Sequence, residues 1–472
     1  MEASEDVLMR PRWAQAMVHE DNSARMALFR MAFVLASLSH LWLADAWQLD
    51  WLPGNALYLV GLALLCWRPW PVAWALCAAG LAWPLLFGRD QLTQSVVLWT
   101  AAAVAAGLGA RAGWRGGGAA TVEAREGTLA WMQGVTILVY ALAVFHKLNV
   151  DFLAPETSCA VHGLDELLVY YRWTDVGLPA WVLTATPWVV LATETAIAGL
   201  LVAGLRRPAW LLAVVFHIPL TLTMAPTFVF VMLVGHVAFV REAELAWVWG
   251  WLRRWWLLVA GTAVGMTAVS LGLHGAWPAV DTVPKEALLW GLVVVAAALL
   301  GAPSAPVVRR LSGRGRALLG VGLVAFGLHG LLPYTGLQFQ HSAAMLSNLR
   351  VDAGCWNSVV VPESARLTDD YIRLDEAWLG APGRIPEYEA TLKDHLWSPP
   401  QLRQMRRNWC RPRVRPIRLE GTFRGRRFGI ADLCDDGPWP FEDDGVFGVE
   451  VFPDYLRFQR NLERRCPCPC IH

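Results

Sequence analysis

Long apolar runs separated by short polar connections fill about the first two-thirds of the 472-residue chain. A bilayer's hydrocarbon core is about 30 Å thick, so a spanning helix needs roughly 20 apolar residues. The candidate runs are 26–46, 54–67, 71–87, 92–110, 128–146, 181–204, 209–224, 225–240, 255–273, 286–301 and 317–333. Pro219 and Pro226 leave open whether 209–240 is two short helices or one broken helix. The pattern predicts an α-helical polytopic membrane bundle of about nine to eleven spans.

The pattern changes near Gly336, after which charged residues and short alternating segments prevail. Two segments flank the turn at Arg424 and Gly425 and predict a β-hairpin. The expected strands are Pro416–Phe423, Arg427–Asp432 and Gly445–Phe452, and the expected helices are Arg384–Leu396 and Pro399–Trp409, the second capped by Ser398. We therefore expect an N-terminal segment over 1–25, a helix bundle over 26–335 and a soluble α+β or mostly β domain over 336–472.

Charge adds an orientation to this picture. Charged residues make up 17% of the chain and the net charge is +1, with no basic stripe of the kind that nucleic-acid-binding proteins carry. With the N-terminus inside, the inner connections are rich in arginine, whereas the outer ones before the soluble domain hold only four basic residues. Those four are Arg89, Lys147, Arg172 and Lys285. This asymmetry predicts a cytoplasmic N-terminus, and an odd number of spans places the C-terminal domain outside.

That orientation places seven cysteines in a compartment where disulfides form. These disulfide candidates are Cys159, Cys355, Cys410, Cys434, Cys466, Cys468 and Cys470. Because seven is odd, at least one thiol is expected to be free, intermolecular or modified. The tail CPCPCIH could instead bind a soft metal, but its spacing differs from that of zinc knuckles, so no metal site is expected. Cys66 and Cys77 fall in apolar runs and are expected to be inert core residues.

Lys147 is the most unusual residue of the chain. Only two other lysines occur, Lys285 and Lys393, and the remaining basic residues are arginines. Lys147 ends a strongly apolar run, where a desolvated amine can lose its proton and act as a base, as a guanidinium cannot. The alternative is a lysine at a helix end whose amine extends into the headgroup region.

Two further polar residues fall inside apolar runs. Glu194 lies near the middle of its run, where a carboxylate is usually functional or paired; the alternative is a wet cavity without a role. His217, with His236 further on, is a candidate for orienting a substrate or carrying protons, and the alternative is a hydrogen-bonded interhelical histidine. No Walker loop, dinucleotide-binding glycine pattern, HExxH or GxSxG motif is present.

The stretch YALAVFHKLNVDFL resembles a signature of the vitamin K-dependent gamma-glutamyl carboxylase family, which includes the bacterial horizontally transferred transmembrane (HTTM) proteins. The matching positions there are Tyr140, Lys147, Leu148, Asn149, Asp151 and Phe152. Glu194, the Phe216–His217 pair and the segment FQHSAAMLSNLRVDAGCWN also resemble family features, as does the ending YLRFQRNLERRCPCPC. These short motifs are spread over most of the chain, and their order and spacing together make the resemblance specific.

The resemblance implies a bacterial inner-membrane protein with a helix bundle and an outer, largely β domain. It implies that Lys147 is the general base that deprotonates reduced vitamin K or menaquinone, with His217 and Glu194 also in the catalytic site. It implies quinone or substrate binding by Tyr140, His146, Asn149, Asp151 and Phe216. Oxygen then oxidises the quinone, and the reaction can be coupled to addition of carbon dioxide to glutamate in an outer peptide.

The chain departs from the family at three places. The stretch GLGARAGWRGGG lacks the histidine that supports carboxylation, Thr93-Gln94-Ser95 replaces Asn-His-Ser, and Gln133 stands where an arginine is common. These departures affect carboxylation more than quinone deprotonation. The alternative function is a non-catalytic membrane scaffold or binding protein that retains the carboxylase-like fold.

Overall fold

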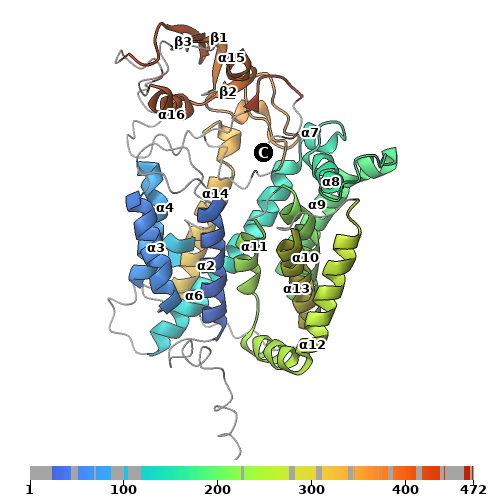
Figure 1. Ribbon diagram of the computed structural model, residues 1–472. Helices are drawn as coiled ribbons and strands as arrows, with labels where there is room; N and C mark the ends of the chain where they lie inside the picture. Colours follow the sequence, from blue (N-terminus) through green and yellow to red (C-terminus); the bar gives the residue numbers. More distant parts are fainter. Residues whose placement is uncertain are drawn as a thin grey trace, which may run out of the picture.

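The chain forms a bundle of helices with a small antiparallel sheet domain at one end (Figure 1). This computed structural model describes residues 24–43, 52–67, 71–86, 100–104, 118–224, 228–275, 282–303, 311–337, 344, 346–369, 371–380, 386–410, 417–435, 441, 462–467 and 470. The predicted strand Gly445–Phe452 and the cysteine Cys468 lie outside these residues.

Every predicted apolar run contains helical residues, and ten of the eleven runs contain a named helix. These helices are α2 (Ala24–Leu43), α3 (Leu52–Trp67), α4 (Pro71–Leu86), α6 (Gly118–Lys147), α9 (Ala180–Val202), α10 (Arg206–Leu222), α11 (Phe228–Val237), α12 (Glu242–Gly272), α13 (Thr282–Leu300) and α14 (Gly313–Gly330). Of the run 92–110 only 100–104 are described, and they are helical. The proline-containing run 209–240 forms two helices, α10 and α11.

Three of the described helices are long and apolar enough to cross a membrane, over Arg125–Lys147, Ala180–Val202 and Glu242–Gly272. Protein covers little of two of them: only 28% of the apolar window in α9 and 11% of that in α12 is buried, against 50% in α6. Trp181, Val202 and Leu257 are each about two-thirds exposed or more. Apolar surfaces of this extent are costly in water and match the inside of a bilayer.

Helix α12 is two helical segments joined by a bend. Trp255 has non-helical angles, φ −115° and ψ 21°, within it. The segment before the bend lies across the lower end of the bundle, and the segment after it runs upright along the outside (Figure 1). The predicted run 255–273 therefore corresponds to the upright segment alone.

Arginines gather at the end of the bundle away from the sheet domain. There Arg25 donates to the carbonyl of Val240 at 2.8 Å and pairs with Glu126 at 3.2 Å. Arg206 and Arg207 both pair with the buried carboxylate of Glu244, at 2.6 and 3.1 Å. These contacts tie the ends of α2, α6, α10 and α12 together and give the bundle one arginine-rich end.

Lys147 and the sheet domain lie at the opposite end. The backbone NH of Val150 donates to the carbonyl of Asn357 at 3.1 Å, and that of Val359 donates to the carbonyl of Leu148 at 3.1 Å. The segment 346–359 is thereby fastened to the turn that follows α6. The arrangement agrees with the prediction that Lys147 and the C-terminal domain share one side.

The sheet domain has five antiparallel strands in the order β4-β3-β1-β2-β5. Its elements are β1 (Ile372–Leu379), α15 (Pro386–Asp394), β2 (His395–Trp397), α16 (Pro399–Trp409), β3 (Ile417–Phe423), β4 (Arg426–Ile430) and β5 (Leu462–Glu463). The hydrophobic core of the domain includes Ile372, Leu374, Ile417 and Leu419 from the sheet and Leu402 from α16.

The structure confirms the β3–β4 hairpin and the cap of α16, where Ser398 and Gln401 form a capping box. The helix predicted over Arg384–Leu396 is shorter, because His395 and Leu396 belong to β2. Strand β1, which pairs with both β2 and β3, was missed. Its sequence IRLDEAWL places two acidic residues side by side, and a bulge between Leu374 and Glu376 breaks the alternation.

Candidate functional site

The end of α6 is fixed by Asn149, two residues after Lys147. Asn149 caps the short helix α7 (Val150–Leu153) by accepting from the backbone NH of Phe152 at 2.8 Å. Its amide donates to the carbonyls of His146 at 2.8 Å and Ser347 at 2.6 Å. Asn149 is completely buried, so this turn is rigidly held and fixes the position from which the Lys147 side chain projects.

Lys147 meets Glu194 of α9. The amine nitrogen Nζ donates to Oε1 of Glu194 at 3.0 Å and also lies 3.0 Å from Oε2. Both side chains are more than nine-tenths buried. The attraction within a buried pair offsets the cost of removing both charges from water only when the geometry is good. Removing one partner leaves an uncompensated buried charge. The two most unusual polar residues of the sequence are therefore partners.

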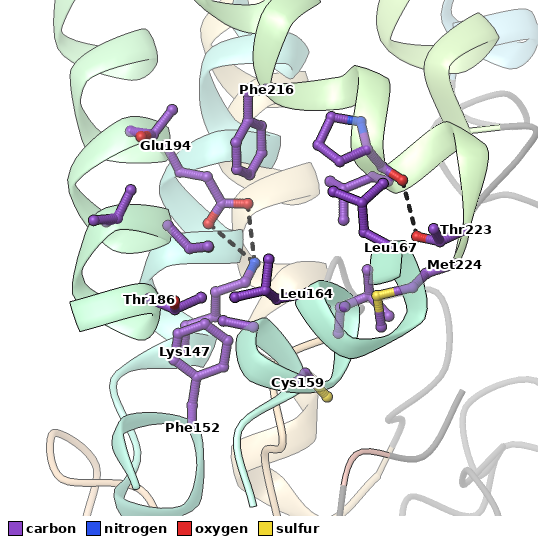
Figure 2. Close-up of a pocket in the computed structure, with 18 residues that line it drawn as sticks. Lys147, Phe152, Cys159, Leu164, Leu167, Thr186, Glu194, Phe216, Thr223 and Met224 are labelled. Carbon is purple, nitrogen blue, oxygen red and sulfur yellow. Dashed lines mark hydrogen bonds and ion pairs between the residues drawn. The ribbon is translucent and has the colours of Figure 1, made fainter. Parts of the chain in front are cut away.

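The pair lies at the wall of a cavity of about 220 Å³ between α6, α9, α10 and α8 (Cys159–Tyr170). Figure 2 shows the two side chains pointing toward each other between Phe216 and Phe152. Two lining threonines turn their hydroxyls back to their own helices, Thr186 to the carbonyl of Val182 at 2.7 Å and Thr223 to that of Pro219 at 2.8 Å. The remaining wall is largely apolar, so Lys147 and Glu194 dominate its polarity.

The cavity borders the apolar exterior of the bundle. Val189 lines it and is nevertheless 60% exposed, and the neighbouring Trp188 is 56% exposed. A lipid-soluble molecule could therefore approach the pair from the side of α9 without crossing a polar surface.

A second polar cluster lies deeper in the bundle. The hydroxyl of Tyr140 on α6 is 2.9 Å from Nε2 of His217 on α10 and 3.0 Å from Nε2 of His236 on α11. All three side chains are buried. Their packing requires a close approach of α11 to α6, since a Cβ on Gly235 would clash with the hydroxyl of Thr136.

Three predicted ligand-binding residues are engaged elsewhere. His146 Nδ1 is 3.1 Å from the Tyr334 hydroxyl, and Asp151 accepts from the amide of Asn357 at 2.9 Å. Together with Asn149 they hold the segment after α14 against the end of α6. Among the predicted binders only Phe216 lines the cavity, and Tyr140 belongs to the deeper cluster.

Six of the seven candidate cysteines form three disulfides. The pairs are Cys159–Cys470, Cys355–Cys466 and Cys410–Cys434. The first joins α8 to the end of the chain beside the cavity, because Cys159 is a lining residue. Cys66 and Cys77 are free; Cys77 is buried as expected, whereas Cys66 is exposed.

Helix α8 was missed, although it supplies a whole wall of the cavity. Its lining residues are Cys159, Ala160, Gly163, Leu164 and Leu167. The signal lay in the sequence: Ser158 caps the helix, and the lining positions recur at helical spacing. At 12 residues the segment is shorter than a membrane span, so apolar length alone does not predict it.

Within the described residues, no group of three or more His, Cys, Asp or Glu side chains could hold a metal ion. Comparison with family models, with curated proteins and with solved structures gives no match to this chain.

Proposed function

We propose that the chain is an integral membrane enzyme of the vitamin K-dependent carboxylase-like type, in which the Lys147–Glu194 pair removes a proton from a reduced quinone. The observation that carries the proposal is the buried ion pair at the wall of an otherwise apolar cavity. An ionised pair is costly there and is usually functional in a membrane helix.

The chemical character of the cavity wall suits a reduced quinone. A reduced naphthoquinone such as reduced vitamin K or menaquinone is a flat aromatic diol with an apolar tail. The rings of Phe152 and Phe216 and the aliphatic wall suit the aromatic ring of the quinone, and the Lys147–Glu194 pair suits one of its hydroxyls. The exposed edge of the cavity at Val189 suits an apolar tail that remains in the lipid.

The pair can act as a base with its own counter-ion. At rest it holds one proton, with Lys147 an ammonium and Glu194 a carboxylate. After the substrate hydroxyl gives up its proton the pair holds two: Glu194 becomes a neutral acid, and the Lys147 ammonium faces the new oxyanion. Lys147 is the direct acceptor if it first passes its own proton to Glu194 across 3.0 Å. Exclusion of water strengthens the ammonium–oxyanion attraction.

Oxygen is the oxidant of the proposed reaction. One reduced quinone and one O₂ give one quinone epoxide and one water, so the two hydroxyl protons end in the water. Gamma-carboxylation would couple to this oxidation: the glutamate γ-carbon loses a proton and forms a bond to carbon dioxide. In this proposal the outer peptide reaches the site from the side of the sheet domain.

We place the protein in a bacterial inner membrane as a multi-pass bundle of about nine to eleven spans. The arginine-rich end would face the cytoplasm, in line with the positive-inside rule. The sheet domain and its disulfides would then lie in the periplasm, where such bonds persist.

The test is aerobic turnover by the purified protein in lipid nanodiscs. With reduced menaquinone, we expect epoxide formation by the wild type and at least about a 10²-fold loss in Lys147→Ala. Lys393→Ala, on the exposed side of the sheet domain, is the matched control and should retain the wild-type rate. Added bicarbonate and a glutamyl peptide then show whether carboxylation is coupled.

The second candidate is a non-catalytic scaffold or binding protein. It is favoured by the use of Asn149 and Asp151, both within the family-like motif, to hold the segment around Asn357. In that case reduced menaquinone stays unchanged with the wild type, and Lys147→Ala alters stability without altering any turnover.

A further inference from the structure

We propose that Tyr140, His217 and His236 form a proton relay that carries the substrate's proton away from the Lys147–Glu194 pair. The inference rests on the proposed function, and it adds His236 and a direction of proton movement. Its basis is one tyrosine hydroxyl placed between two histidine nitrogens, at 2.9 and 3.0 Å.

The three groups form a short series of hydrogen bonds in which both donors point the same way at any one time. A tyrosine hydroxyl has one proton to donate and oxygen lone pairs to accept. If it donates to Nε2 of one histidine, that histidine carries its proton on Nδ1. The other histidine then donates from Nε2 to the tyrosine oxygen. To reverse the arrangement, one proton enters at Nδ1 of the histidine that donates to the tyrosine, one shifts across each of the two hydrogen bonds, and one leaves from Nδ1 of the histidine that accepts. The net result is the transfer of one proton through the cluster, which is what a relay requires.

The relay begins beside the cavity. His217 follows Phe216, a cavity-lining residue, on α10, and Tyr140 precedes Lys147 by two turns of α6, roughly 10 Å along the axis. We assign the transfer from Glu194 to His217 to a water molecule in the cavity.

The relay ends at His236. Its Nε2 faces Tyr140, and its Nδ1, although buried, has no hydrogen-bond partner among the described residues. A buried ring nitrogen without a partner is costly in a purely structural cluster. The indole of Trp210 holds the backbone by donating to the His236 carbonyl at 2.8 Å. His236 can therefore receive a proton at Nε2 while its ring remains in place.

The proposed sequence moves one proton and no electrons. The substrate hydroxyl protonates Glu194, Glu194 protonates His217, and the Tyr140 hydroxyl passes a proton to Nε2 of His236 while it receives one from His217. Glu194 is again a carboxylate beside the Lys147 ammonium, and His236 is an imidazolium. Separating the proton from the oxyanion prevents their immediate recombination. The same path returns the proton when water forms.

The experiment is solid-state NMR of ¹⁵N-histidine-labelled full-length protein in lipid bilayers, without oxygen. Without ligand, the wild type should show His217 and His236 in opposite tautomers, one protonated at Nδ1 and one at Nε2, assigned with His236→Asn. Tyr140→Phe should uncouple them. Tyr58→Phe, at a buried tyrosine of α3, should leave both signals unchanged. The same tautomer in both histidines of the wild type overturns the relay without reference to the quinone.

Reduced menaquinone is then added, and its anion is followed by absorbance. The proposal expects the anion to form and His236 to become an imidazolium in the wild type. In Tyr140→Phe, anion formation should be slower by about 10²-fold and His236 should stay neutral. An anion with a neutral His236 in the wild type overturns the relay but not the base. Absence of the anion overturns the proposed function and the relay with it.

Discussion

Lys147 and Glu194 stabilise each other's charge in a place where neither residue alone would stay ionised. Each is buried beside an apolar cavity, so neither could remain charged without the other. In the proposed reaction, the lysine would supply a cation that stays beside the developing oxyanion, and the glutamate would take up the extra proton. A base built in this way needs no bulk water at the reacting oxygen.

Breaking the pair should destabilise the protein more than removing it. Glu194→Gln leaves a buried ammonium opposite a neutral amide, and we expect a loss of about 3–5 kcal/mol in the free energy of unfolding. The double variant Lys147→Met/Glu194→Leu should recover most of that stability and show no turnover. Thermal unfolding in detergent measures both.

Glu166→Gln is the matched control, because Glu166 is exposed on α8 and its ion pair with His162, at 3.7 Å, is also exposed. It should change stability by less than about 1 kcal/mol. If Glu194→Gln were as mild as Glu166→Gln, the buried pair would not carry the stability assigned to it.

The sequence identified the paired residues but not the pairing. Lys147 and Glu194 each stood out because charge is rare in apolar runs. The roles of Asn149 and Asp151 could not be predicted from local spacing, because Ser347 and Asn357 lie about 200 residues away in the chain. Sequence position shows that a polar residue is unusual, whereas its partner depends on the fold.

At the scale of the elements, helix α8 is held in place by contacts at both of its ends. At its start, the backbone NH of Cys159 donates to Asn348 at 2.6 Å, and Cys159 forms a disulfide with Cys470. At its end, Tyr170 and Tyr171 donate to the buried carboxylate of Glu286 at 3.2 and 3.3 Å. Burial, and then the neighbouring Glu286 carboxylate, raise the pKa of Tyr170 above its usual value, so its hydroxyl remains a donor even in alkaline solution.

Removing the Cys159–Cys470 disulfide should make helix α8, which forms one wall of the cavity, more mobile. The double variant Cys159→Ser/Cys470→Ser loses a cross-link between residues 311 positions apart, which typically stabilises by about 2–5 kcal/mol. We expect faster hydrogen exchange across α8 and a several-fold higher KM for reduced menaquinone, with a smaller change in kcat.

The matched control is Cys410→Ser/Cys434→Ser, which removes the disulfide of the sheet domain. Its effect on exchange should be confined to α16 and the strands. Equal exchange in α8 for the wild type and for Cys159→Ser/Cys470→Ser would contradict the role given to this disulfide.

The positions of the long helices were predictable, because the length of an apolar run is enough to indicate a helix. Every predicted run contains helical residues, whereas α8 and β1 were not predicted. Helix α8 is too short for a span, and the bulge in β1 interrupts the alternation that marks a strand. The bend of α12 at Trp255 has no proline or glycine at that position to announce it.

For the whole molecule, the two ends of the bundle differ in charge and in redox chemistry. The arginine contacts around Glu244 lie at one end, and the three disulfides lie toward the other, with the sheet domain and Lys147. A membrane between the two ends would separate a reducing compartment from an oxidising one. The cavity would then lie near the outer boundary.

Reporter fusions test this orientation. Alkaline phosphatase, which is active only outside the cytoplasm, should be active when fused after His472 and inactive when fused after Val240, before α12. Green fluorescent protein, which fluoresces only inside, should give the opposite result at the two positions. Phosphatase activity at Val240 together with none at His472 would reverse the orientation.

The central claim is that Lys147, paired with Glu194, deprotonates a reduced quinone. The most direct measurement is the absorbance spectrum of reduced menaquinone bound to the purified protein at neutral pH without oxygen, which isolates proton removal from oxidation and from carboxylation. We predict the spectrum of the hydroquinone anion with the wild type and with Lys393→Ala, and that of the neutral hydroquinone with Lys147→Ala. An unionised hydroquinone bound to the wild type, or an anion that persists in Lys147→Ala, would contradict the account.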